Sequence, residues 1–169
     1  IMSAVLRFAQ RGGLVWGIGN GFQILTECRL LPGAFLCNAQ LRFLCSPQYL
    51  RVERNDLAFT NQYRTGQVIQ IPINHGEGNY SISDDGYRQL EENNQIVLRY
   101  VTPEGEMSAN GNPNGSRANI AGIVNREGNV FGMMPHPERV MEEIIGGVDG
   151  QGMFLSILKH RERRTQHGA

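Results

Sequence analysis

Five consecutive residues, Gly17-Ile18-Gly19-Asn20-Gly21, have the spacing of a turn that presents a reactive side chain between a strand and a helix. In such G-x-Nuc-x-G turns, a strained backbone exposes the nucleophile beside backbone N–H groups that can stabilise an oxyanion. The middle position here is Gly19, which has no side chain. The segment therefore has the shape expected for acyl-transfer chemistry but lacks the group that would attack.

Two other interpretations of this glycine segment are open. A dinucleotide-binding loop requires the pattern G-x-G-x-x-G, and Phe22 occupies the place of the third glycine. The acidic residue expected about twenty positions later is also missing, which disfavours this interpretation. A purely structural role remains, because glycines allow a strand and a helix to pack closely.

A second segment, Pro135-His136-Pro137-Glu138, supplies groups for proton transfer. In extended chain, residues two apart point the same way, so Glu138 can approach the imidazole of His136 and fix its tautomer. His136 could then act as a base toward a nucleophile and as an acid toward a leaving amine. The alternative is a surface turn in which His136 has no chemical role.

The same His-x-Glu spacing recurs at His75-Gly76-Glu77. Two such pairs could together form a metal site of imidazole and carboxylate ligands, as in a metal-dependent hydrolase. The pairs lie far apart in the sequence and lack a ligand signature such as H-E-x-x-H, so a polar turn is the other interpretation of this segment. Cys28 follows Gly19 by nine residues, which places it inside the expected helix and too far along to replace the absent nucleophile.

The elements that must position these residues follow an α/β pattern. The continuous apolar run of residues 14–18 predicts a strand buried on both faces, and a helix follows the glycine turn and ends at Leu31-Pro32-Gly33. Further helices are predicted over residues 1–10, 84–92 and 150–161, strands over 40–45, 49–53, 67–73, 95–101, 120–124 and 129–134, and a long polar loop over 102–119. This succession predicts a parallel sheet with helices packed on it.

The composition excludes several classes of protein. Apolar residues make up 40% of the 169 residues and charged residues 19%, which is enough for a packed core, and a net charge of zero gives no sign of a nucleic-acid or membrane partner. There is neither a membrane-spanning apolar run nor a secretory signal. The three cysteines have no C-x-x-C spacing, so a reducing cytosol is expected and the Asn114-Gly115-Ser116 sequon is given little weight.

The beginning of the chain predicts that its N-terminal portion is missing. Ile1, Val5 and Ala9 share one helical face, and no capping residue precedes them. We therefore expect residues 1–169 to form a single domain whose first part is absent.

Several sequence segments are characteristic in combination. They are "GIGNGFQILTE", "LLPGA", "NDLAFT", "HGEGNY", "NPNGS", "IAGIVNREGNVFGMMPHPER" and "GGVDGQGMF". In this combination they resemble the glutaminase subunit of phosphoribosylformylglycinamidine synthase, a class I glutamine amidotransferase of purine biosynthesis. The resemblance extends from Ile1 to about Lys159. The glycine turn of residues 17–21 with its following helix and the segment "GMMPHPER" are together specific to this subfamily.

This resemblance implies a fold and a set of site residues. The implied fold is α/β, a flavodoxin-like three-layer sandwich with a mostly parallel central sheet. Gly19 falls at the position of the family's cysteine nucleophile, and His136 and Glu138 correspond to the other triad members. The amide N–H of Asn20 would donate to the oxyanion, and Gln23 would lie near the bound glutamine. No metal site is implied.

The resemblance also implies an activity and partners. The family hydrolyses glutamine and supplies ammonia for the ATP-dependent conversion of formylglycinamide ribonucleotide to formylglycinamidine ribonucleotide. The implied partner is a large synthetase subunit, with or without a small helper subunit; ATP and magnesium act there, and this subunit needs no cofactor. A cytoplasmic location is implied, with neither nucleic acid nor membrane as a partner.

Two departures from the family pattern change this expectation. Gly19 cannot form a thioester, and the family's N-terminal strands, with the loop that gives a second oxyanion donor, have no counterpart in this sequence. The chain is therefore expected to be inactive as written. The alternative is a non-catalytic subunit that docks on the same synthetase.

Overall fold

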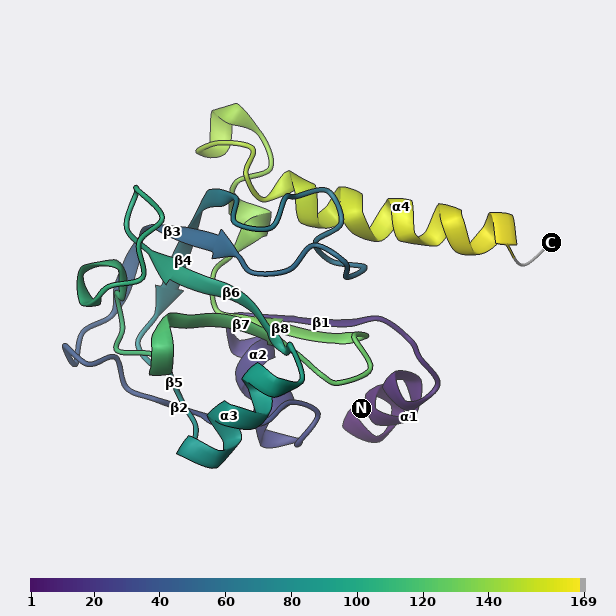
Figure 1. Cartoon of the computed structure of the whole chain (residues 1–169), viewed down its shortest axis with the longest axis horizontal. Coiled ribbons are helices and arrows are strands. Elements are labelled where there is room, and N and C mark those ends of the chain that lie inside the picture. Colours follow the sequence, from purple (N-terminus) through teal and green to yellow (C-terminus); the bar gives the residue numbers. More distant parts are fainter. Residues whose placement is uncertain (168–169) are drawn as a thin grey trace.

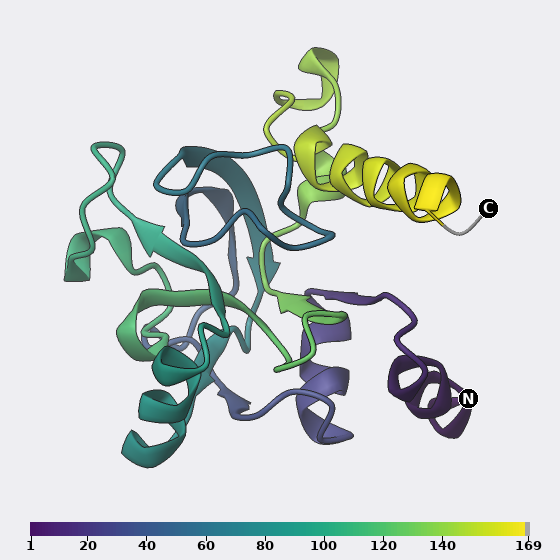
Figure 2. The same ribbon diagram turned by 45° about the vertical axis from the view of Figure 1, so that its right-hand side comes forward.

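The computed structural model describes residues 1–167 and is built around one six-stranded sheet with the strand order β1-β8-β7-β6-β3-β4. The strands are β1 (Val15–Ile18), β3 (Leu44–Val52), β4 (Val68–His75), β6 (Ile96–Val101), β7 (Ile120–Val124) and β8 (Val130–Met133). A second sheet pairs β2 (Ala34–Leu36) with β5 (Asn79–Ser81), and both of these short strands escaped prediction. The large sheet is strongly twisted and curls around its core (Figure 2).

The sheet is not mostly parallel, and this prediction was wrong. Among the described strands only β1 and β8 run parallel, whereas β8–β7, β7–β6, β6–β3 and β3–β4 are antiparallel. The physical reason is the absence of crossover helices between most neighbours. A short turn joins β7 directly to β8, and such a connection can only produce antiparallel strands.

Helices cover both faces of this sheet, as expected for a layered α/β fold. The helices are α1 (Met2–Gln10), α2 (Asn20–Glu27), α3 (Asp84–Glu92) and α4 (Gln151–His167), with single 3-10 turns η1 (Ala109–Gly111), η2 (Arg117–Asn119), η3 (Pro137–Arg139) and η4 (Glu143–Ile145). Helices α2 and α3 lie on one side of the sheet and α4 on the other (Figure 1). The three-layer part of the predicted fold is therefore present.

Two apolar cores correspond to the two faces. Ile69, Ile71 and Ile73 alternate with more exposed residues along β4 and pack with Met153 of α4 in one core. The other core contains Phe22 of α2 together with residues from α3, β7 and the small sheet. This alternation is what fixes the register of β4, because a slip by one residue would turn all three isoleucines to the other face.

Several predicted boundaries differ from the observed ones, and α4 extends to His167 instead of ending at residue 161. Helix α2 ends at Glu27, because Arg29 adopts a left-handed conformation with φ of 60° and turns the chain before Leu31. Strand β3 is continuous where two strands were expected. Pro47 is tolerated in it because that part of β3 pairs only with β4, where Pro47 is opposite Pro72.

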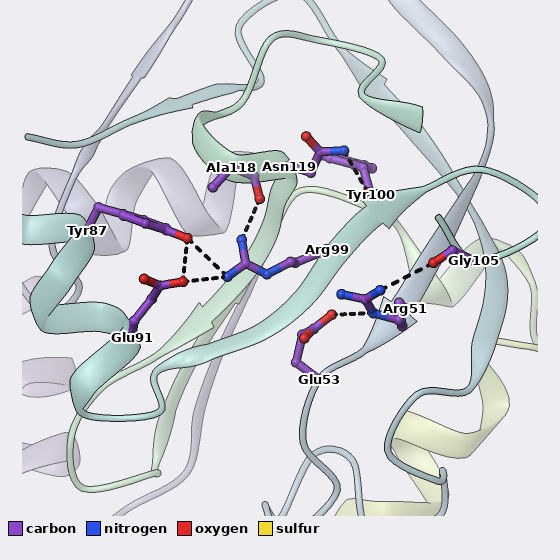
Figure 3. A network of polar contacts seen from close by, with 9 residues as sticks. All are labelled: Arg51, Glu53, Tyr87, Glu91, Arg99, Tyr100, Gly105, Ala118 and Asn119. Carbon is purple, nitrogen blue, oxygen red and sulfur yellow. Dashed lines mark hydrogen bonds and ion pairs between the residues drawn. The ribbon is translucent and has the colours of Figure 1, made fainter. Parts of the chain in front are cut away.

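Arginines anchor the long loop that follows β6 (Figure 3). Arg51 and Arg99 are directly opposite each other on β3 and β6, a pairing of like charges that must be compensated. Arg99 is buried and donates through Nη1 to the carbonyl of Ala118 at 2.5 Å, and through Nη2 to the Tyr87 hydroxyl and the Glu91 carboxylate, both at 3.4 Å. These bonds fasten the end of the loop to the sheet and to α3.

The rest of this loop is held by backbone carbonyl groups (Figure 3). Asn119, which has a left-handed φ of 59°, donates through Nδ2 to the carbonyls of Tyr100 and Ser108, each at 2.9 Å. Arg51 donates to the carbonyl of Gly105 at 3.3 Å. The loop therefore has a defined shape although it is long and polar.

No helix in the described part of the chain is long and apolar enough to cross a membrane. The cysteines Cys28, Cys37 and Cys45 are all free thiols. Cys28 caps the C-terminal end of α2 and its Sγ lies 3.6 Å from the carbonyl of Leu25, so it belongs to the helix end and not to the glycine turn.

Candidate active site

The parallel pairing of β1 with β8 places the two predicted chemical segments side by side. Ile18 is the register partner of Met133, so the carboxyl ends of β1 and β8 meet at one edge of the sheet. The N–H of Gly19 donates to the Met133 carbonyl at 2.9 Å, and the N–H of His136 donates to the carbonyl of Pro72 on β4 at 2.8 Å. Ligand sites of open α/β sheets form at such strand ends.

Gly19 occupies a strained turn between β1 and α2. Its φ of 54° and ψ of −115° lie in a region that side chains rarely adopt, which is the backbone signature expected of a nucleophile elbow. A Cβ atom built on Gly19 would lie 2.8 Å from Nε2 and 2.9 Å from Cε1 of His136. The imidazole therefore points at the place from which a side chain at position 19 would project.

The other ring nitrogen of His136 is bound as the sequence predicts. Nδ1 of His136 lies 2.7 Å from Oε1 of Glu138, a distance at which Nδ1–H donates to the carboxylate. The His136 side chain is only 15% exposed, and the Glu138 side chain is 44% exposed. This arrangement leaves Nε2 unprotonated in the neutral ring, facing the elbow, and able to accept a proton.

The first turn of α2 supplies the remaining predicted residues. Asn20 begins the helix, and backbone N–H groups of a first helical turn have no acceptor within the helix. Gln23 lies one turn further on and donates through Nε2 to the carbonyl of Glu77 at 2.7 Å. The structure thus brings Gly19, Asn20, Gln23, His136 and Glu138 to one edge of the sheet.

The glycines flanking the elbow are also needed for packing. A Cβ atom on Gly17 would lie 2.6 Å from the backbone of Gly21 and from the Leu25 side chain. The structural interpretation of the glycine segment is therefore correct for Gly17, and it coexists with the elbow geometry at Gly19.

The second His-x-Glu pair does not form a metal site in the described part of the chain, where no group of three possible ligands is assembled. His75 continues the buried side of β4 and is 5% exposed, whereas Glu77 is exposed. Burial lowers the pKa of His75 to about 4, and repulsion between the two imidazolium forms of His75 and His136 acts in the same direction. A neutral, enclosed imidazole is the result.

Two asparagines next to His75 were not predicted to belong to the site. Asn38 and Asn114 are both fully buried, and each hydrogen-bonds to the His75–Gly78 segment. In the sequence Asn114 stands in the long polar loop, in a glycosylation sequon and in the "NPNGS" segment, and its burial argues against glycosylation. Asn38 follows β2 without any spacing that marks it, since its partners in the 75–78 segment are almost forty residues away.

Comparison with known proteins identifies the family. Residues 1–165 match the family model of the CobB/CobQ-like glutamine amidotransferase domain. The phosphoribosylformylglycinamidine synthase subunit PurQ of Moorella thermoacetica is 56% identical over all 169 residues of this chain, which span 72% of that protein. The chain belongs to the PurQ family of glutamine amidotransferases.

Other PurQ proteins are similarly close. The subunit from Symbiobacterium thermophilum is 54% identical over 165 residues. This match covers 98% of this chain and 70% of the Symbiobacterium protein. The PurLQS structure from Thermotoga maritima superposes with a TM-score of 0.79 at 47% identity, over 92% of this chain and 66% of the Thermotoga chain. These matches confirm the predicted family and the class I amidotransferase fold.

Proposed function

We propose that the chain is the glutaminase subunit of a phosphoribosylformylglycinamidine synthase, with glycine at the position of the nucleophile. The observation that carries this proposal is the geometry around Gly19: Nε2 of His136 lies 2.8 Å from the expected Cβ, and Nδ1 is held by Glu138. A base aimed at the tip of a strained elbow is the arrangement that activates a thiol.

Each residue then has a role when position 19 is cysteine. His136 takes the thiol proton, and the thiolate attacks the side-chain amide carbon of glutamine. The N–H of Asn20 stabilises the resulting oxyanion. His136 next protonates the leaving nitrogen, which departs as ammonia, and water cleaves the glutamyl thioester to release glutamate. Glu138 keeps the imidazole in the Nδ1–H tautomer throughout.

The partner and its cofactors follow from the family. The relatives are named as subunits of a synthase, and the Thermotoga structure is an assembly named PurLQS. We propose that this chain binds a large synthetase subunit, with a small helper subunit completing the complex. ATP and magnesium would act on the synthetase, and ammonia would pass to it from the elbow. A cytoplasmic location suits this role and the free cysteines.

Glutamine turnover in the presence of a PurL partner tests the proposal. The chain as written should release no ammonia from glutamine, because it lacks the nucleophile. The Gly19→Cys variant should gain turnover by several orders of magnitude over background, and His136→Ala in that variant should remove about 10²-fold or more of it. Turnover by the Gly19 chain, or a Gly19→Cys variant that binds the partner without hydrolysing glutamine, would refute the assignment.

Gly19 itself favours a second candidate function, a docking subunit without glutaminase activity. A PurQ-type fold with no nucleophile could still complete the synthetase and support its use of free ammonia. The complex would then form product from ammonia but not from glutamine. The comparison is product formation from each nitrogen source with the chain as written: stimulation by ammonia alone supports docking, and no stimulation by either source excludes it.

A further inference from the structure

Asn38 makes an unusually complete set of contacts with one short segment of the chain, residues 75–78. Its backbone N–H donates to the carbonyl of Gly76 at 2.9 Å, and its Nδ2 donates to the carbonyls of His75 at 2.8 Å and of Arg42 at 2.7 Å. Its Oδ1 accepts the N–H of Gly78 at 2.9 Å and lies 3.0 Å from Nδ1 of His75. A fully buried side chain with every donor and acceptor used fixes its partners strongly.

The opposite side of the same segment is held by the long loop. Asn114 donates through Nδ2 to the carbonyl of Gly78 at 2.8 Å, and the hydroxyl of Ser116 lies 3.2 Å from the same carbonyl. Oδ1 of Asn114 in turn accepts from the Ser116 hydroxyl at 2.6 Å. The loop anchored by Arg99 therefore closes on the segment from one side while Asn38 holds the other.

These contacts determine the tautomer of His75. Because Nδ2 of Asn38 donates to two carbonyls, its Oδ1 faces the ring, and Nδ1 of His75 must carry the proton. Nε2 then accepts from Nδ2 of Asn114, 3.5 Å away. A Cβ atom on Gly78 would lie 2.1 Å from Cε1 of His75, so only glycine lets the ring lie this close to the backbone.

The segment held in this way reaches the elbow. Glu77 lies between Gly76 and Gly78, and its carbonyl accepts the hydrogen bond from Gln23 of α2 at 2.7 Å. Gln23 is one helical turn beyond Gly19, whose carbonyl begins that turn. The carbonyl of Glu77 is therefore the point at which the buried polar cluster meets the glutaminase site.

We propose that Asn38 is a positioning residue for this site: together with Asn114 it fixes residues 75–78 and the Nδ1–H tautomer of His75, so that the carbonyl of Glu77 orients Gln23 for glutamine. This inference rests on the proposed function for its ligand. It gives His75 the role of a neutral, hydrogen-bonded side chain that supports residues 75–78. This role differs from that of a metal ligand and from that of a triad member. The side chain of Asn38 does not itself touch the elbow.

Glutamine binding to the chain as written tests the positioning role, because Gly19 allows binding to be measured without hydrolysis. Calorimetry should show that Asn38→Ala weakens glutamine binding by about tenfold or more. The matched control is Asn129→Ala, which removes another buried asparagine that bridges two carbonyls, those of Ala9 and Gly13, at 2.8 Å each. Equal losses in both variants, or no loss in Asn38→Ala, would overturn the proposal.

The imidazole tautomer gives a second readout, one that needs no glutamine. In two-bond ¹H–¹⁵N spectra of the parent chain at pH 7, His75 should be the Nδ1–H tautomer, and Asn38→Ala should convert part or all of it to Nε2–H. Finding Nε2–H in the parent, or the same tautomer in both proteins, would overturn the proposal. Should the parent bind no glutamine, the proposed function fails, and the tautomer alone decides whether Asn38 positions His75.

Discussion

Nε2 of His136 occupies space that a side chain on Gly19 would need, since the two lie within 2.8 Å when a Cβ is built. The imidazole is tethered to Glu138 through Nδ1 and is the end of a side chain that can turn. A cysteine at position 19 therefore requires the imidazole ring to move away from the new Cβ, after which the thiol and Nε2 are neighbours. The elbow and its base are complementary in position even though Gly19 carries no side chain between them.

Substitution at the elbow should cost stability. Gly19→Ala places a side chain at a φ of 54° and against His136, so the free energy of unfolding should fall by about 1–3 kcal/mol. Gly21→Ala is the matched control, because a Cβ there meets nothing within 4 Å and alanine favours the helix by up to about 1 kcal/mol. Urea denaturation of both variants measures this. Equal stability of the two would show that the turn is not strained.

Glu138, which binds Nδ1 of His136, should affect the rate of catalysis and not the stability of the fold. In the Gly19→Cys background, Glu138→Gln should lower the turnover of glutamine by at least about tenfold, because the amide no longer stabilises the imidazolium or enforces its tautomer. Glu92→Gln, which changes an exposed glutamate of α3, should leave turnover unchanged. Steady-state ammonia release gives the comparison, and an unaffected Glu138→Gln variant would remove Glu138 from the triad.

His75 should make stability depend on pH. Its pKa is about 4 in the folded chain and about 6.5 when unfolded, so between these values the unfolded state binds up to one more proton. Stability should therefore fall as the pH is lowered through this window, by up to about 1.4 kcal/mol per pH unit from this group. Above pH 6.5 the contribution is fully present.

The control for this titration is His75→Gln, which keeps a polar side chain but removes the ionisable group. The variant is expected to be less stable at pH 7 and to lose less stability between pH 6.5 and 4 than the parent does. Urea unfolding at several pH values gives both slopes. Parallel curves for the two proteins would mean that His75 is already charged in the folded chain or that it titrates normally.

The sequence predicts the site better than it predicts the sheet. The elbow and the His136–Glu138 pair are local patterns, and the predicted contact of Glu138 with His136 is observed, although Glu138 lies in the 3-10 turn η3 and not in the extended chain that the prediction assumed. Strand direction depends on how distant segments pair, and alternating apolar residues look alike in parallel and antiparallel strands. The helix predicted over residues 84–92 is confirmed as α3, and in the structure the Ser83 side chain caps it by accepting from the N–H of Gly86.

The buried polar cluster could not be foreseen for a different reason. Asn38, His75 and Asn114 meet only because β2, β4 and the long loop converge, and their side chains carry no periodicity that would reveal it. Asparagine is common in exposed loops, so the burial of Asn38 and Asn114 depends on the tertiary structure and cannot be inferred from the residue type. The His75-Gly76-Glu77 motif is visible in the sequence, but its neighbours in the fold decide that His75 is a hydrogen-bonding group and not a metal ligand.

The central claim, that position 19 is the seat of a nucleophile served by His136, is tested most directly by covalent labelling. A chloroketone analogue of glutamine should alkylate the Gly19→Cys variant once, with loss of chloride, and peptide mass spectrometry should place the label at position 19. His136→Ala should slow this labelling by about 10²-fold. The parent chain, which contains only Cys28, Cys37 and Cys45, should remain unlabelled under the same conditions. Labelling confined to one of those three cysteines, or labelling at position 19 that does not depend on His136, would contradict the account.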